Sequence, residues 1–451
     1  MPKKLFGTDG IRGVPGEYPL DDRTLFWIGR TLGDYLGRTG ASPRVLMGMD
    51  TRESGPRIAG WIAQGLVTAG ASPANAGVIS TPGVAWLVRQ KGYSGGVVIS
   101  ASHNPFHDNG VKLFSSSGIK FPDEVEEWLE GEIIRQRDRG PARGSVAVPV
   151  DDSFTEEYLA FLRNRKIPGA EFSSLKIVLD CANGAASRLG PQLFRGLGAQ
   201  VVAIHNEPDG RNINFRCGSL HPESLQQEVL ETRGSFGVAF DGDADRAVFV
   251  SASGKLVNGD GTLLAAARYL KATGQLKGTH VVGTAMANLG LERVLAAEAL
   301  SLIRVPVGDR YVLEEMLRSG ANLGGEQAGH IIFLDDSPAG DGLLTAVKMA
   351  SLVSLEGPLD ELVKGLKIFP QTILNVKVRS KPPLDSLPQV STTLAEAERR
   401  LGDAGRIVLR YSGTEPLARV MVEAERPEDV ERWAQALAGA IRSSIGVREG
   451  A

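Results

Sequence analysis

Short apolar runs alternate along the chain with longer stretches in which apolar residues recur every three or four positions. In the first third, residues 45–47 predict a strand and residues 55–69 a helix that ends at Gly70. Further strands are predicted near residues 78–79 and over 97–99, which are rich in β-branched residues. The order strand, helix, strand indicates a βαβ unit, which is typical of α/β proteins.

The same order returns twice further along the chain. The predicted elements of these two units lie at residues 177–179, 185–197, 201–204 and 238–240, and then at 281–282, 289–299 and 302–305. Each βαβ pattern is followed by another strand and a polar loop. We infer three related units, each of which presents one polar loop to a shared cleft.

Two stretches are interpreted as connections between domains. Residues 135–150 are charged and rich in Gly and Pro, and residues 366–371 precede a region in which strands and helices predict a small α+β domain. The predicted fold is therefore three similar α/β domains and a smaller α+β C-terminal domain around a central cleft. The expected domain boundaries are 1–150, 151–255, 256–368 and 369–451.

Composition excludes several classes of function. The 451 residues carry a net charge of -3 with both signs mixed, so nothing indicates a nucleic-acid-binding surface. Cys181 and Cys217 are too few for a disulfide framework, and no run of about 18 apolar residues predicts a membrane span. We expect a soluble cytoplasmic protein. The histidines without metal-ligand spacing, interpreted as structural or solvated, are His107, His205, His221 and His280.

A serine-containing loop closes the predicted strand at 97–99. The sequence Ser-Ala-Ser-His-Asn-Pro over residues 100–105 is turn chemistry, because proline excludes helix at the residue before it. The loop therefore holds the hydroxyl of Ser102 at the end of a rigid strand, where it can meet a ligand. His103 is the chain neighbour of Ser102, which we judge a poor geometry for a base that activates it.

The strongest local signal is an acidic loop at residues 241–246, Asp-Gly-Asp-Ala-Asp-Arg. Asp241, Asp243 and Asp245 alternate with small residues between two predicted strands, so all three carboxylates can face one point. Oxygen ligands select a hard cation, Mg²⁺ or Ca²⁺. An EF-hand is excluded because its sixth and twelfth positions would be Arg246 and Ala252 instead of Gly and Glu. An acidic surface turn is the alternative.

Three further loops carry polar groups that suit a sugar phosphate. Residues 410–416, Arg-Tyr-Ser-Gly-Thr-Glu-Pro, with Arg419 beyond them, combine arginine and turn amides that can hold phosphate, and an ordinary Ser-Gly turn with solvated arginines is the alternative. Residues 324–330 could bind sugar hydroxyls, the alternative being a solvated loop. Residues 6–13 are too glycine-rich for a strand. Arg12 lies in this segment, and Lys112 follows the serine loop. Each could contact phosphate or be a plain surface charge.

Common alternatives find no support in the sequence. No Gly-x-x-x-x-Gly-Lys-[Ser/Thr] motif indicates a P-loop, and the strand-to-helix turn of the second unit lacks Gly-x-Gly-x-x-Gly. The Gly-x-Ser-x-Gly motif of many serine hydrolases is also absent.

Taken in order, these motifs resemble those of the α-D-phosphohexomutases, and the resemblance spans nearly the whole chain. The matching segments are residues 6–13, 100–105, 241–246, 307–312, 324–330 and 410–416. The opening segment and the Gly-Gly-Glu-Gln and Ser-Gly-Thr-Glu-Pro loops favour the branch that acts on glucosamine phosphates. The family implies four domains around a cleft, which agrees with the repeats inferred above.

The resemblance implies roles for individual residues. Ser102 would be phosphorylated, and one Mg²⁺ would be held by the serine phosphate with Asp241, Asp243 and Asp245. Lys112 and Arg246 would balance charge, Arg12 would be a further catalytic residue, and the proton acceptor stays open among Lys112, His103 and His330. The residues implied to bind the substrate are Glu326 and Gln327 for the sugar, and Arg410, Ser412, Gly413, Thr414 and Arg419 for the phosphate that is not transferred.

The implied reaction interconverts glucosamine 6-phosphate and glucosamine 1-phosphate through glucosamine 1,6-bisphosphate, and feeds UDP-N-acetylglucosamine and cell-wall precursor synthesis. Mutases for glucose or mannose phosphates, a magnesium-dependent phosphatase and a non-catalytic sugar-phosphate sensor are the alternatives. Two positions depart from the family pattern: Ala244 replaces a frequent Gly, which matters little if its φ is negative, and Ala328 replaces a usual Ser. The oligomeric state is open, a homodimer being one expectation.

Overall fold

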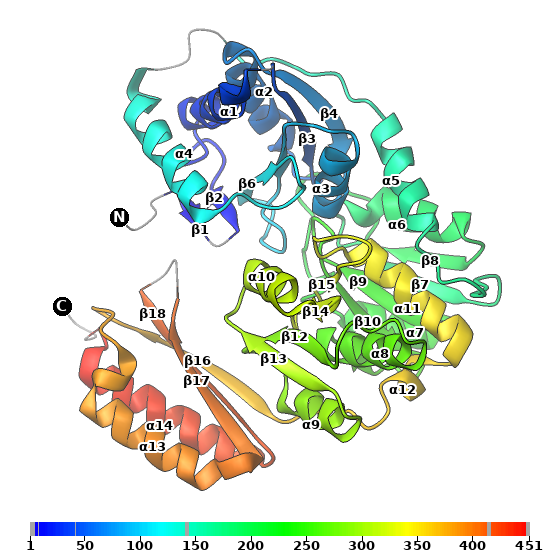
Figure 1. The fold of residues 1–451 in the computed structure, drawn as a ribbon, viewed down its shortest axis with the longest axis vertical. Helices are drawn as coiled ribbons and strands as arrows, with labels where there is room; N and C mark the ends of the chain where they lie inside the picture. The colour runs from blue at the N-terminus through cyan, green and yellow to red at the C-terminus, as the bar shows by residue number, and fades with distance from the viewer. Residues whose placement is uncertain (1–4, 8, 41, 140–143, 413–415, 448–451) are drawn as a thin grey trace. The chain divides into compact units, whose positions relative to one another are not determined.

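The computed structural model describes residues 5–7, 9–40, 42–139, 144–412 and 416–447. Figure 1 follows the elements in chain order from blue to red. The chain divides into two compact units, one formed by Met1–Thr284 with Val305–Lys364 and the other by Ala285–Arg304 with Gly365–Ala451. Within the described ranges, no helix is both long enough and apolar enough to cross a bilayer.

The first sheet is mixed and has six strands. Its spatial order is β1-β2-β6-β5-β3-β4, formed respectively by Phe6–Gly7, Gly10–Gly13, Asn109–Ser115, Gly95–Ile99, Arg44–Met49 and Ser72–Val78. Strand β3 is parallel to β4 and β5, whereas β6 is antiparallel to β5 and β2. The predicted strands at 45–47 and 97–99 are confirmed.

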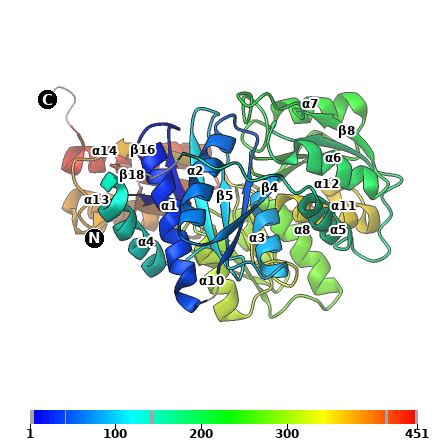
Figure 2. The same cartoon turned by 90° about the horizontal axis from the view of Figure 1, so that it is seen from above.

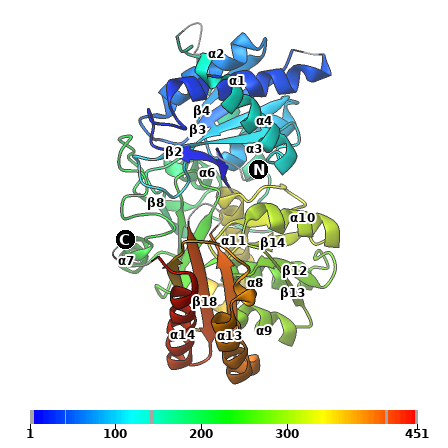
Figure 3. The same ribbon diagram turned by 90° about the vertical axis from the view of Figure 1, so that its left-hand side faces the viewer.

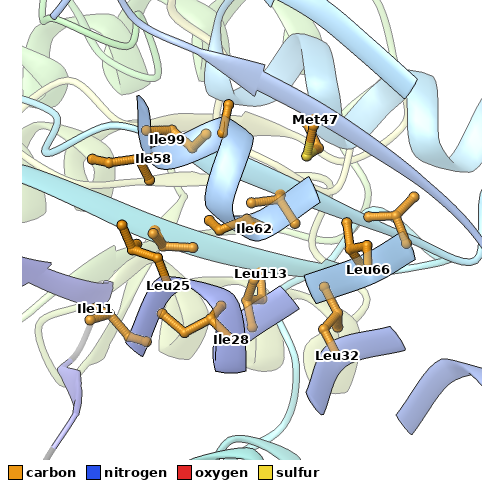
Figure 4. Close-up of a cluster of buried hydrophobic side chains, with 14 of the residues drawn as sticks. Ile11, Leu25, Ile28, Leu32, Met47, Ile58, Ile62, Leu66, Ile99 and Leu113 are labelled. Carbon is orange, nitrogen blue, oxygen red and sulfur yellow. The ribbon is translucent and has the colours of Figure 1, made fainter. Parts of the chain in front are cut away.

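Alternate residues of β3 face two helical layers. The helices are α1 (Asp22–Leu36), α2 (Gly55–Thr68), α3 (Thr81–Gln90) and α4 (Asp123–Gln136). Met47 and Ile99 join a buried apolar cluster with Ile28 and Ile62 from α1 and α2 (Figure 4). On the other face α3 packs against β3 and β5. Figure 2 labels α3 beside β4 and β5 of this sheet. The first domain is therefore a sheet covered on both sides.

The second sheet has five strands in the order β11-β10-β9-β7-β8. These strands are Leu256–Val257, Ala247–Ser251, Phe236–Phe240, Lys176–Asp180 and Gln200–Ile204. Strand β7 is parallel to β8 and β9, and β10 is antiparallel to β9. The helices of this part are α5 (Ser153–Arg163), α6 (Ala186–Gly196) and α7 (Glu223–Thr232). The predicted strands of the second unit are confirmed, and the acidic loop follows β9 directly.

In the third α/β part, β12 (His280–Thr284) is parallel to β14 (Leu323–Gly325), which is antiparallel to β15 (Ile331–Phe333). The turn between β14 and β15 carries residues 326–330. The helices are α8 (Gly259–Ala272), α10 (Asp309–Ser319), α11 (Gly342–Glu356) and α12 (Leu359–Leu362).

The second compact unit contains the C-terminal α+β domain. Its antiparallel sheet, in the order β16-β18-β17, is formed by Gln371–Lys377, Leu417–Ala424 and Gly405–Tyr411. Figure 3 shows α13 (Pro388–Leu401) and α14 (Pro427–Ile445) beside this sheet. Trp433 and Leu437 of α14 pack on Val420 and Val422 of β18. The unit also holds α9 (Leu289–Ala297) and all of β13 (Ser301–Val305) except its last residue.

One prediction about backbone structure is wrong. Residues 6–13 were expected to be too glycine-rich for a strand, yet β1 and β2 pair as an antiparallel hairpin. Strand β2 is also paired with β6, so tertiary hydrogen bonding outweighs weak local propensity. Gly10, at φ +81°, lies so close to β6 that a Cβ there would come within 2.4 Å of the Val111 carbonyl oxygen. Glycine is what allows this close pairing.

Candidate active site

The serine loop is bent and buried at its centre. Ser102 has a φ of +51°, which is uncommon for a residue with a side chain, and only 1% of the residue is exposed. Its amide donates to the Ser100 hydroxyl at 2.9 Å, and that hydroxyl donates to Asp50 Oδ2 at 2.6 Å. The Ser102 hydroxyl donates to Oδ2 of Asp241 at 2.6 Å. The serine is thereby aimed at the acidic loop.

A fully buried arginine holds the same loop from behind. Arg52 forms an ion pair of 2.9 Å with Asp50, and both side chains are inaccessible to solvent. The two terminal nitrogens of its guanidinium donate at 2.5–3.0 Å to the backbone carbonyls of Ser102, Asn104, Pro105 and Asp108. Asn214 adds a second donor, since its Nδ2 reaches the carbonyls of Ser102 and Asn104 at 2.8 and 2.9 Å. Buried carbonyls without such partners would be costly.

The three carboxylates of the acidic loop meet at one point. Asp241, Asp243 and Asp245 are buried, and one oxygen from each lies within 4.8 Å of the others. Burial, together with the charges of Asp245 and Asp243, raises the pKa of Asp241 well above its ordinary range. The ionised form of Asp241 is therefore disfavoured beside the other two carboxylates, and a cation at this point would favour it.

Two orphaned oxygens show that this donor set suits a metal. Oδ1 of Asp243 and Oδ1 of Asp245 are buried and accept no hydrogen bond from the described residues. Buried carboxylate oxygens without partners are rare in folded proteins unless they face an ion or water. An all-oxygen donor set is what Mg²⁺ binds. The residues present therefore fit the cation that the sequence suggests.

Lys112 lies between the acidic loop and the N-terminal hairpin. Its Nζ is 2.9 Å from Asp243, 3.0 Å from Asp9 and 3.5 Å from Asp245. Burial opposes its charge, but these carboxylates raise the pKa of Lys112 well above its ordinary value. Lys112 is therefore an ammonium that neutralises carboxylates. Arg12 lies on the same side, donating to Asn104 Oδ1 at 3.0 Å and pairing with Asp9 at 2.7 Å.

His103, expected to have a poor geometry for a base that activates Ser102, nevertheless lies within hydrogen-bond distance of it. Its Nδ1 lies 3.2 Å from the Ser102 hydroxyl and 3.3 Å from Nη1 of Arg246. The positive φ of Ser102 is the local feature that separates this turn from an extended strand, in which neighbouring side chains point apart. Burial, with the charges of Arg246 and Arg12, lowers the pKa of His103 to about 4.

The loop at 326–330 is attached to the acidic loop through the backbone. The Ala247 amide, just after Arg246, donates to the Gly329 carbonyl at 3.1 Å. Glu326 accepts from the Gly308 amide at 3.1 Å, and Gln327 donates to Asp260 at 3.2 Å. His330 is buried, with Nε2 3.8 Å from Asp309. Lys120 pairs with Asp309 at 2.7 Å and Asp9 at 2.6 Å, which joins the start of α10 to the hairpin.

The predicted phosphate loop belongs to the second compact unit. Arg410 and Arg419 are direct cross-strand partners on β17 and β18. Burial, with the charge of Arg419, lowers the pKa of Arg410. Ser412 is buried and donates its amide to the Leu417 carbonyl at 2.8 Å. Gly413 and Thr414, which were also predicted to bind phosphate, lie outside the described residues.

A second group of ligand-type atoms lies at the end of β7. Asp180, His205 and Cys217 each place one such atom within 4.8 Å of the others, which the sequence spacing of His205 did not indicate. The Asp180 carboxylate is already engaged, since it is 3.1 Å from His205 Nδ1 and accepts the amides of Ala182 and Gly218. These contacts give the group a structural role, because they hold together the loops that follow β7 and β8.

One further correction concerns the acidic loop. Ala244 has a φ of +55°, so the condition under which replacing Gly would matter little does not hold. This conformation costs a residue with a Cβ roughly 1 kcal/mol.

The sequence did not identify Arg52 and Thr81 as residues that support the site. Their only signal was that polar residues follow strands β3 and β4. Thr81 contacts Asp243 through both its amide and its hydroxyl.

Comparisons with known proteins agree with this architecture. Models of the phosphoglucomutase/phosphomannomutase family match α/β/α domains I, II and III at residues 3–139, 156–254 and 258–369, and the C-terminal domain at 373–440. A phosphoglucosamine mutase of Solibacter usitatus is 52% identical, with 99% of this chain and 100% of the relative covered. That of Geobacillus thermodenitrificans is 44% identical, with 98% and 99% covered.

Solved structures show the same fold. A phosphoglucomutase/phosphomannomutase family protein of Burkholderia thailandensis superposes with a TM-score of 0.78 at 24% identity, covering 98% of this chain and 99% of that one. N-acetylphosphoglucosamine mutase of Aspergillus fumigatus, solved with GlcNAc-6P and magnesium, gives 0.69 at 18% identity over 99% and 96%. The full-length relatives, the four matched domains and the site geometry together establish that this chain belongs to the phosphoglucosamine mutases of the phosphoglucomutase/phosphomannomutase (α-D-phosphohexomutase) family.

Proposed function

We propose that the chain interconverts glucosamine 6-phosphate and glucosamine 1-phosphate, with Ser102 as the phosphoryl carrier. The observation that carries this assignment is the 2.6 Å hydrogen bond from Ser102 to Asp241, within a buried acidic cluster that has two orphaned oxygens. Full-length relatives at 41–52% identity are phosphoglucosamine mutases, which supports the choice of sugar.

The reaction consists of two phosphoryl transfers. In the first, the bond between phosphorus and Oγ of phosphorylated Ser102 breaks while a bond forms to O1 of glucosamine 6-phosphate; the O1 proton leaves to a base and Ser102 Oγ gains a proton. The resulting glucosamine 1,6-bisphosphate then reorients in the site. In the second, the bond from phosphorus to O6 breaks and O6 gains a proton, while Ser102 Oγ loses its proton to a base and takes the phosphoryl group back. Such transfers depend on positioning and on charge neutralisation.

The residues that would hold one Mg²⁺ are Asp241, Asp243 and Asp245 with the phosphate on Ser102. When bound, the cation supplies positive charge that neutralises phosphate oxygens. Phosphoserine adds nearly two negative charges to those of the three aspartates. The positive charges of Lys112 and Arg246, which pair with Asp243 and Asp245, help to balance this total.

Other residues of the chain bind and orient the substrate in this proposal. Glu326 and Gln327 present a carboxylate and an amide to sugar hydroxyls, and their loop is joined by a backbone hydrogen bond to the strand that follows Arg246. Arg410, Ser412 and Arg419, with Gly413 and Thr414, bind the phosphate that is not being transferred. The proton acceptor comes from His103 or His330, because the carboxylates around Lys112 keep it an ammonium. Nδ1 of His103 lies 3.2 Å from the Ser102 hydroxyl.

The test follows sugar phosphates by ³¹P NMR with Mg²⁺ and a trace of the 1,6-bisphosphate. Glucosamine 6-phosphate is expected to give glucosamine 1-phosphate faster than glucose 6-phosphate or mannose 6-phosphate gives its 1-phosphate. Intact mass should show a phosphate on Ser102 that phosphatase removes. Stoichiometric release of inorganic phosphate, or ligand binding without isomerisation, would contradict the proposal.

A further inference from the structure

Helix α3 begins against the acidic loop of the neighbouring domain. Its first residue is Thr81, and only 5% of Thr81 is exposed. The Thr81 hydroxyl donates to Oδ2 of Asp243 at 2.5 Å, and the Thr81 amide donates to the Asp243 carbonyl at 3.0 Å. One residue of the first domain therefore fixes both the side chain and the backbone of an aspartate that lies 162 positions away.

The two oxygens of Asp243 differ in their surroundings. Oδ2 accepts from Thr81 and from Nζ of Lys112, at 2.5 and 2.9 Å. Oδ1 is equally buried and accepts no hydrogen bond from the described residues. A carboxylate with one saturated and one unsatisfied oxygen is suited to bind a cation through the unsatisfied one.

We propose that Thr81 is a positioning residue for the metal, acting through Asp243. Its hydrogen bond to Oδ2 fixes the rotation of the carboxylate and leaves Oδ1 as the oxygen without a partner among the described residues. This inference rests on the proposed function, in which Asp243 is a metal ligand. Partners of metal ligands that fix their orientation commonly change metal affinity roughly tenfold to a hundredfold when they are removed.

Lys112 cannot supply this orientation by itself. Its ammonium is shared among Asp243, Asp9 and Asp245. A shared point charge favours a negative group nearby but specifies its rotation poorly. The Thr81 hydroxyl makes a single directed hydrogen bond from a helix whose backbone is tied to the same residue, so it determines which oxygen is left for the cation.

Three substitutions separate the hydroxyl from the helix that carries it. Thr81→Val keeps the β-branched shape and removes the hydroxyl, whereas Thr81→Ser keeps the hydroxyl. Ser80→Ala is the matched control, because Ser80 caps the same helix by accepting from the Gly83 amide at 3.2 Å and makes no hydrogen bond to Asp243 among those described. Ser80→Ala can lower the melting temperature, but among the described contacts it removes no hydrogen bond to the three aspartates of the acidic loop.

The experiment titrates the dephosphorylated full-length protein with Mn²⁺ and measures the free ion by electron paramagnetic resonance. We expect the Kd for Mn²⁺ to rise roughly tenfold to a hundredfold in Thr81→Val, and to stay close to wild type in Thr81→Ser and Ser80→Ala. In turnover assays, Thr81→Val should need more Mg²⁺ for half-maximal rate and recover at saturating Mg²⁺. If Thr81→Val does not fold, Thr81→Ala carries the same expectation.

Asp243→Asn is titrated alongside, so that two kinds of failure are distinguishable. If Asp243→Asn weakens Mn²⁺ binding while Thr81→Val and Thr81→Ala bind like wild type, the positioning role is refuted and the metal site stands. If Asp243→Asn itself binds like wild type, the acidic loop is not the metal site, and both the inference and the metal assignment of the proposed function are overturned.

Discussion

The Ser102 hydroxyl donates a 2.6 Å hydrogen bond to Oδ2 of Asp241, which joins the serine loop of the first domain to the acidic loop of the second. Neither loop forms the centre alone, because the hydroxyl and the carboxylates come from different sheets. Phosphorylation would place a strongly charged group where this hydrogen bond now lies. The charge of that group would have to be balanced by the cations around the acidic loop.

Ser102→Ala is expected to leave less than about 1% of wild-type turnover, because no other group takes its place as phosphoryl carrier. The fold should persist, since the change removes one oxygen from a loop held by Arg52. Turnover and melting temperature are measured together. A folded variant that keeps more than a few per cent of wild-type activity would rule out Ser102 as the carrier.

Chelation of divalent cations should abolish turnover, and added Mg²⁺ should restore it. Asp243→Asn should weaken metal binding strongly, because it removes one of three ligand charges. Asp335→Asn is the matched control, since Asp335 is a half-exposed acid paired with Lys277 outside the cluster. Calorimetric titration with Mg²⁺ compares the three proteins. Full activity after chelation would show that the cluster is not a functional metal site.

Arg52→Lys should lower kcat with little change in KM. A lysine ammonium is a point donor and cannot reproduce the planar fork that serves four carbonyls and Asp50. Each buried carbonyl left without a donor costs about 1–3 kcal/mol. Hydrogen exchange over residues 102–108 should therefore speed up. Arg57→Lys, at a half-exposed pair with Asp22, is the control. Unchanged kcat and unchanged exchange would count against this role.

Arg410→Ala should raise KM for the sugar phosphate while Ser102 phosphorylation is preserved. Losing a charge-assisted contact to phosphate costs on the order of 2 kcal/mol, or about thirtyfold in kcat/KM, in both directions of the reaction. The C-terminal unit should not lose stability through electrostatics, because the like charge of Arg419 across the ladder is relieved. Arg400→Ala, at an exposed position on α13, is the control. Unchanged kcat/KM in both directions would refute the assignment.

Asp341→Asn should alter how stability depends on pH. Burial raises the pKa of Asp341 from 3.8 to about 6, although its carboxylate accepts hydrogen bonds from the Leu344 amide and the Tyr158 hydroxyl. Between these pH values the folded state holds a proton that the unfolded state releases. The contribution of Asp341 is therefore present below about pH 4 and lost as pH rises through about 6, by on the order of 3 kcal/mol.

Asparagine does not titrate, so it isolates this effect. The free energy of unfolding of the wild type minus that of Asp341→Asn should fall as pH rises from about 4 to about 7. Urea denaturation at several pH values measures it. A difference that stays constant or grows with pH would mean that the folded protein does not retain the proton on Asp341.

The strands and chemical loops could be predicted from the sequence because their signals are local. Strands β3, β5, β7 and β9 are buried and read as apolar runs, and Ser102 and the three aspartates directly follow such runs. Strand β2 could not be predicted in this way, because its ladder partner β6 begins 96 residues after its own last residue, Gly13. Its pairing with β6, together with the burial of Ile11 in the core, stabilises a strand that its glycine-rich sequence does not indicate.

The residues that position the serine and acidic loops could not be predicted from the sequence for a related reason. Arg52, Thr81 and Asn214 act on backbone carbonyls or on a carboxylate that lies 50 to 162 positions away. Such contacts leave no pattern in the local sequence. The left-handed conformation of Ala244 was equally hidden, because alanine rarely adopts it and nothing beside it in the chain indicates it.

The hydrogen bonds from Thr81 to Asp243 and from Asn214 to the Ser102 carbonyl have a consequence for how such enzymes exchange parts during evolution. Each bond has one partner in the first domain and one in the second. A gene recombined at the boundary between these two domains would combine halves that had not been selected together, with mismatched donors and acceptors at the catalytic centre. The first two domains should therefore be inherited as a pair, and chimeras of relatives that exchange both together should stay active where single-domain exchanges fail.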